Sequence, residues 1–190
     1  MERSSWNIKM MELKPGDVIV VWGNRLISYL IYAVFGIHDP ASHAEMVYNE
    51  VDNISSDVGG VKLRPTARLF KAKKWVVLRN KKVNVNLVQR QSAKYIGRGY
   101  DYALYAIWIM RISLILQPLI WLIGQPFRNW LKREEAKRFT CSELVVQVLK
   151  DLGITTGIDE PHNACPDNLL EAGRACVHDW EFVASGGSLK

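Results

Sequence analysis

Apolar and polar positions alternate differently along the two halves of the chain. Short β-branched runs bounded by Gly, Pro, Asn or Asp predict strands at 13–23, 42–50 and 74–80. The stretch 53–65 predicts a returning strand or pair of strands, broken near Gly59 and Gly60. From about residue 84 the apolar residues recur at helical spacing instead. The pattern therefore predicts strands first and helices mainly afterwards.

Helical spacing and its end signals predict the helices. A segment ending at Gly36, a short helix capped by Thr66 and a helix ending at Gly97 have such signals. The predicted helices span 25–36, 66–72, 84–97, 100–116, 141–150 and 165–173. A closing strand is expected at 176–184.

The segment 103–123 is strongly apolar and approaches the length of a membrane span. Arg111 lies inside it and Pro118 interrupts it, and a central arginine is costly in hydrocarbon. We expect a core helix that runs into an apolar elaboration suited to contact with a membrane surface or a protein partner.

Composition and charge narrow the classes of function. The 190 residues suit a single domain, and 48% apolar with 23% charged residues is ordinary globular composition. The net charge of +6 comes without a nucleic-acid-binding signature, so no nucleic acid partner is expected. The three cysteines cannot all pair and no signal peptide is evident, so we expect reduced thiols and cytoplasmic synthesis, with membrane association or delivery to the cell envelope left open.

Cys141 stands where a helix is expected to begin. Thr140 and Glu143 form the Thr-x-x-Glu capping-box pattern, which places the sulfur among the unpaired N–H groups of the first turn. Those donors favour the thiolate, which is the nucleophilic form of cysteine. A small buried structural cysteine is the competing interpretation.

A nucleophilic cysteine needs a base, and the chain has four histidines. His43 lies in a predicted strand, which fixes the direction of its side chain, whereas His38 lies in a turn and is expected to face solvent. His43 is therefore the predicted base. His162, Cys165, Cys176 and His178 could instead bind zinc, but their spacing matches no familiar finger and no metal is predicted.

Five stretches in order resemble the circularly permuted NlpC-type papain-fold cysteine hydrolases, the YiiX-like group. They are LKPGDVIVVWG, SHAEMVYN, GYDYALYA, FTCSELVVQVL and CPDNLLEAG. The resemblance implies one domain over 1–190, an α+β fold in which helices pack on an antiparallel sheet, and an apolar and basic insertion at about 111–137. It also implies that Cys141 is the nucleophile, that His43 is the base and that Tyr100 lies near the site.

The third catalytic residue is left open by the resemblance, because the family commonly places Glu or His on the next strand and NISSDVGGV has neither. Ser55 is at the best-matching position, and Asp57 offers a carboxylate on the same strand face. Glu45 is a further candidate and shares a strand face with His43, but a hydrogen bond between such neighbours on one strand is awkward. Glu45 is otherwise predicted to contact substrate.

The implied function is hydrolysis of an amide bond through an acyl-enzyme, with cell-wall stem peptides or similar peptides as substrate and no cofactor. Two alternatives remain. The protein could act on lipid esters or thioesters at a membrane, which the apolar segment favours, or it could be an inactive binding module.

Overall fold

The computed structural model describes residues 12–23, 28–29, 32–33, 36, 38–101, 138–158, 160–176 and 178–187. A six-stranded sheet with order β4-β3-β2-β1-β5-β8 forms its centre, and every neighbouring pair is antiparallel. The strands are β1 (Val18–Trp22), β2 (His43–Val47), β3 (Asp52–Asp57), β4 (Gly60–Pro65), β5 (Lys74–Asn80) and β8 (Trp180–Gly187). The sheet confirms the expected α+β class.

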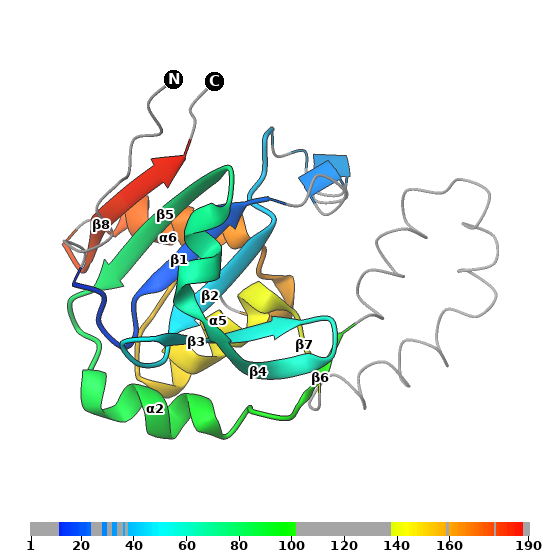
Figure 1. Ribbon diagram of the computed structural model, residues 1–190. Coiled ribbons are helices and arrows are strands. Elements are labelled where there is room, and N and C mark those ends of the chain that lie inside the picture. The colour runs from blue at the N-terminus through cyan, green and yellow to red at the C-terminus, as the bar shows by residue number, and fades with distance from the viewer. Residues whose placement is uncertain are drawn as a thin grey trace.

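The sheet has helical elements on both faces (Figure 1). These are η2 (Thr66–Lys71), α2 (Val85–Ala93), α5 (Cys141–Asp151), η3 (Pro161–Asn163) and α6 (Pro166–Ala175). In the view of Figure 1, α5 and α6 lie behind the sheet, and the short η2 coil crosses in front of it.

The central strand β1 is buried on both faces, which explains its continuous apolar run. Val18 and Val20 belong to the core cluster that includes Leu144 of α5, whereas Ile19 belongs to a second cluster with Leu69 of η2. Alternate residues of β1 therefore join the two layers of the core.

A separate two-stranded pair, β6 (Gly99–Tyr100) and β7 (Arg138–Phe139), runs parallel and leads directly into α5. The amide of Val61 in β4 donates to the carbonyl of Arg98 at 2.8 Å, which attaches this pair to the sheet. Gly60 has φ 92°, and a Cβ there would meet the Arg98 carbonyl oxygen at 2.3 Å. Only glycine fits where these two backbones approach.

The predicted strands at 13–23, 42–50, 53–65 and 74–80 are confirmed, as are the helices at 141–150 and 165–173. The Thr66 cap is wrong: Pro65 is the N-cap of η2, and the Thr66 hydroxyl donates to Asn53 Oδ1 at 2.7 Å. The helix expected to reach Gly97 ends at Ala93 and continues as turns, and the closing strand begins at Trp180.

Tyr100 is in β6 rather than at the start of a helix. The remainder of that predicted helix, the apolar segment 103–123 and the expected insertion at 111–137 lie outside the described residues, as does most of the helix expected at 25–36. Within the described ranges, no helix is long and apolar enough to cross a membrane.

Candidate active site

Cys141 is the first residue of α5, as the capping box predicted. The Thr140 hydroxyl accepts from the Glu143 amide at 3.3 Å, and Glu143 Oε2 accepts from the Thr140 amide at 3.2 Å. The cysteine is 4% exposed. Its burial favours the neutral thiol, but the charge and hydrogen bond of His43 and the amides of Ala44 and Ser142 outweigh burial and lower the pKa of Cys141. A charged His43 therefore shifts the equilibrium of Cys141 toward the thiolate.

His43 begins strand β2 and is in hydrogen-bonding contact with Cys141. Its Nε2 lies 2.6 Å from Glu45 Oε1, and because a carboxylate only accepts, this nitrogen carries the proton. The other ring nitrogen, Nδ1, is thereby left for the thiol. Desolvation opposes the imidazolium, but Cys141 and Glu45 together raise the pKa of His43 to about 10.

Glu45 is fully buried and holds His43 from two positions along the same strand. Arg68 of η2 donates to the same carboxylate oxygen, Oε1, and Asn53 Nδ2 donates to Oε2 at 3.3 Å. Burial alone would favour the protonated acid, but His43, Ser55 and Arg68 outweigh burial and lower the pKa of Glu45. The carboxylate is thus ionised and fixed by groups from three elements.

The site lies where β2 and β3 part. Their register pairs Met46 with Ile54 and Val47 with Asn53, and it does not extend to the start of β2. Alternation places Ala44 and Met46 on the α5 face, whereas His43 and Glu45 point to the η2 face. The first turn of α5 reaches the imidazole at this opening, which explains how groups from both faces of one sheet meet.

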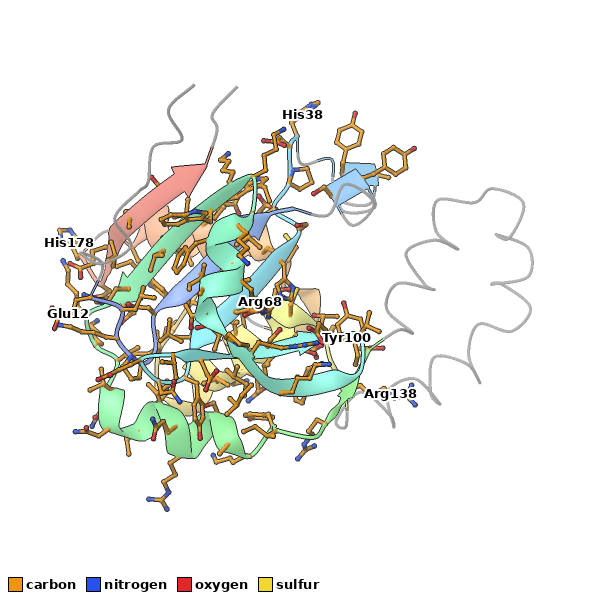
Figure 2. All side chains as sticks on the ribbon, in the orientation of Figure 1. Glu12, His38, Arg68, Tyr100, Arg138 and His178 are labelled. Atoms are coloured by element: carbon orange, nitrogen blue, oxygen red, sulfur yellow. The ribbon has the colours of Figure 1, made fainter. Side chains whose placement is uncertain are left out.

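The two histidines labelled in Figure 2, His38 and His178, lie apart from the elements that carry Cys141 and His43. Arg68 lies near the middle of the molecule, whereas His38 and His178 lie at its periphery (Figure 2). Both are exposed. The prediction that His43, rather than His38, meets Cys141 agrees with this arrangement.

The predicted third residues separate in the structure. Ser55 is buried with its hydroxyl 3.4 Å from His43 Nε2, so it contacts the imidazole as a secondary partner. Asp57 binds Lys62 at 3.0 Å and Arg64 at 2.9 Å, and the structure does not bring it to His43. Glu45, a further candidate for the third residue that we otherwise expected to contact substrate, contacts the imidazole.

Tyr100 is 9% exposed and pairs in the β6–β7 ladder with Phe139, two residues before Cys141. The Ser56 hydroxyl donates to the Phe139 carbonyl at 2.5 Å, which ties this ladder to β3. Tyr100 is therefore near the start of α5, as the resemblance implied, although its side chain is largely covered.

Sequence reasoning missed three supporting side chains: Arg68, Asn53 and Asp167. Asp167, in the first turn of α6, accepts from the Ala41 amide at 3.0 and 3.3 Å. This contact fixes the chain two residues before His43. The only sequence signal for Asp167 was its place at a helix start, and nothing local marked the other two.

The alternative metal cluster is not assembled in the described part of the chain. There, no group of three or more His, Cys, Asp or Glu side chains is placed to hold a metal ion. Cys165 is buried and desolvation raises its pKa to about 11, whereas Cys176, His162 and His178 are exposed.

Comparison with solved structures shows a similar fold in the metalloprotein YiiX of Escherichia coli O157:H7, a DUF1105 protein. The TM-score is 0.59 at 18% sequence identity, covering 92% of this chain and 98% of that one. No protein-family model and no curated protein matches the sequence. The likeness extends the YiiX-like resemblance to the fold as a whole.

Proposed function

We propose that this protein is a cysteine hydrolase that cleaves an amide bond through an acyl-enzyme on Cys141. The observation that carries the proposal is the chain of contacts from Cys141 to His43 and on to the buried Glu45. It joins a thiol at a helix start, a base and a carboxylate that fixes the base, which are the parts that nucleophilic catalysis requires.

In the first step, the Cys141 thiolate attacks the substrate carbonyl carbon and the π electrons move onto oxygen. The amides of Glu143 and Leu144 are already bonded to Thr140. The amide of Cys141 begins the same turn and is the proposed donor to the oxyanion, joined by the Ser142 amide once the sulfur has lost its negative charge in the new S–C bond. His43 then gives its proton to the leaving amine as the C–N bond breaks.

In the second step, water attacks the thioester. Neutral His43 accepts the proton of this water, and the thiolate leaves as the carboxylic acid is released. Glu45 remains ionised throughout, so its task is to orient and stabilise the imidazolium. Every atom in the cycle is supplied by the chain, the substrate and water.

YiiX is described as a metalloprotein, and the contacts around His43 and Glu45 in this chain do not fit a metal ion. His43 Nε2 is engaged by Glu45, and Arg68 and Asn53 occupy the same carboxylate. An arginine against a carboxylate competes with a cation for its oxygens. The proposed mechanism therefore passes through no metal.

The substrate is proposed to be a peptide of the cell-wall stem-peptide type. The test is incubation with γ-D-glutamyl peptides, followed by intact-mass detection of an acyl adduct on Cys141. Wild type should form the adduct and release product, Cys141→Ala should do neither, and Cys165→Ala should behave as wild type. Turnover that persists in Cys141→Ala would disprove the proposal.

Nucleophilicity can be measured separately from substrate choice. Iodoacetamide should label Cys141 at pH values well below the ordinary thiol pKa of about 8.5. His43→Ala should slow this labelling at neutral pH. If Cys141 labels no faster than Cys165, the residue is a structural thiol and the binding-module alternative gains support.

A further inference from the structure

Three cations line the sheet face that carries His43, and we call Lys62, Arg64 and Arg68 the basic edge. In the β3–β4 register Lys62 is opposite Ser55 and Arg64 is opposite Asn53, so these side chains share the face of Ser55 and Asn53. Arg68 approaches the same face from η2. Their side chains are 35%, 37% and 35% exposed, so each can meet a ligand.

The basic edge is close to the reacting groups. Lys62 is the cross-strand neighbour of Ser55, whose hydroxyl is 3.4 Å from His43 Nε2. Arg68 donates to Glu45, the carboxylate that holds the same ring. Each cation is thus one or two side chains away from His43, whose own ring is 20% exposed.

Charge is not balanced along this edge. Asp57 is the shared partner of Lys62 and Arg64, and Glu45 is shared by Arg68 and His43. Two carboxylates and the Cys141 thiolate therefore meet three fixed cations and an imidazolium, which leaves one positive charge in excess. The Nε atoms of Arg64 and Arg68 have no hydrogen-bond partner among the described residues and are buried, so only the exposed parts of these side chains could meet a ligand.

We propose that the basic edge selects substrates that carry an anionic oxygen group, a carboxylate or a phosphate, beside the scissile bond. The inference rests on the proposed function, because it assigns a substrate class to the same thiol. Guanidinium and ammonium groups bind such oxygens by charge-assisted hydrogen bonds. Partial desolvation beside His43 strengthens the attraction relative to open solvent.

The test compares two alkylating reagents of similar size on the intact chain. Iodoacetate is anionic and iodoacetamide is neutral, and in both the thiolate forms an S–CH₂ bond while iodide leaves with the C–I electrons. Their rate ratio at Cys141 measures anion selectivity, and a change in thiolate population cancels in the ratio.

The ratio should fall when the charge is removed. An elementary charge within about 10 Å in a solvent-like dielectric alters the rate of an anionic reagent about twofold. The double variant Lys62→Gln/Arg64→Gln should therefore lower the iodoacetate to iodoacetamide ratio about fourfold. Added salt should weaken the wild-type preference.

Lys94→Gln is the matched control, because Lys94 is also a surface cation paired with an acid, Asp151. Asp151 ends α5 and Cys141 begins it, so about 15 Å of helix separates this pair from the thiol. The control should keep the wild-type ratio.

Two competitors distinguish the source of the anion. Protection of Cys141 from iodoacetamide by a γ-glutamyl peptide with a free α-carboxylate assigns a carboxylate, and protection by inorganic phosphate assigns a phosphate. Rapid iodoacetamide labelling with an unchanged reagent ratio in the double variant would overturn the anion selectivity and leave the hydrolase proposal standing. Slow labelling of Cys141 by both reagents in wild type would overturn the hydrolase proposal itself.

Discussion

Glu45 Oε1 lies 2.6 Å from His43 Nε2, although the two residues are neighbours on one face of one strand. Side chains at i and i+2 of a strand stand roughly parallel, so this contact needs something to turn the carboxylate toward the ring. Arg68 and Asn53 supply that restraint from outside the strand. The orienting residue is thus a product of tertiary packing.

Glu45→Gln should lower the thiolate population of Cys141 at neutral pH. The Glu45 charge helps to hold the pKa of His43 at about 10, so its loss weakens the imidazolium that stabilises the thiolate. We expect iodoacetamide labelling of Cys141 at neutral pH to fall about tenfold, equivalent to about 1.4 kcal/mol, whereas labelling at alkaline pH, where the thiolate forms without the imidazolium, should match wild type. The pH profile of labelling measures this, and an unchanged rate at neutral pH would refute the orienting role.

Asp57→Asn should leave that same pH profile as in wild type. Its carboxylate is held by Lys62 and Arg64 and has no described contact with the ring. Ser55→Ala should have an intermediate effect, because its hydroxyl is 3.4 Å from His43. An Asp57→Asn profile that matches Glu45→Gln would show that Asp57 is the orienting carboxylate after all.

Thr140→Val should weaken the start of α5. The substitution keeps the side-chain shape and removes the oxygen that accepts from the Glu143 amide, so we expect a loss of about 1 kcal/mol in the free energy of unfolding. Thr140→Ser keeps the acceptor and should restore most of that loss. Urea unfolding measures both, and equal stability of the two variants would contradict the capping role.

Asp167→Ala should slow the labelling of Cys141 and also destabilise the fold slightly. The carboxylate holds the Ala41 amide, and its loss frees the chain just before His43. We expect about 1 kcal/mol of destabilisation and a severalfold lower labelling rate at Cys141. Asp167→Asn, which keeps an oxygen acceptor, should recover the rate, and failure of that rescue would argue against positioning through Ala41.

Acid should destabilise the protein partly through Asp151. Desolvation is outweighed by Tyr95, Lys94 and Gln147, which lower the pKa of Asp151 from 3.8. A carboxylate with a lowered folded pKa contributes stability above its unfolded pKa, and that stability is lost as pH falls through the folded pKa. Asp151→Asn should therefore lose less stability than wild type as the pH falls from neutral to about pH 3. If urea unfolding gives the same difference in free energy of unfolding between wild type and Asp151→Asn at every pH, this prediction is contradicted.

Local signals predicted the parts of the fold that local physics controls. The β1 run, the returning strands around Gly59 and Gly60, and the Thr140–Glu143 capping box are each complete within a few residues, and each is confirmed. The same capping box and a fixed strand led to Cys141 and His43. Their contact depends on how α5 packs on the sheet, and the family resemblance supplied that expectation.

The sequence-based predictions fail where residues that are distant in sequence determine the contacts of a side chain. Thr66 looks like a helix cap, but Asn53 on a neighbouring strand takes its hydroxyl. The role of Glu45 depends on Arg68, which is 23 residues away in sequence. Apolar periodicity past Ala93 does not reveal that Tyr95 turns to bond Asp151 at 2.8 Å. No pattern within one segment carries these partners.

The parallel pairing of β6 with β7 has an evolutionary consequence. Gly99 pairs with Arg138 and Tyr100 with Phe139, so the two ends of the intervening sequence are held together beside α5. Chain of different length or composition can be exchanged between these clasped ends without altering the register that delivers Cys141. The framework that holds Cys141 beside His43 can therefore stay unchanged in evolution while this one segment is replaced.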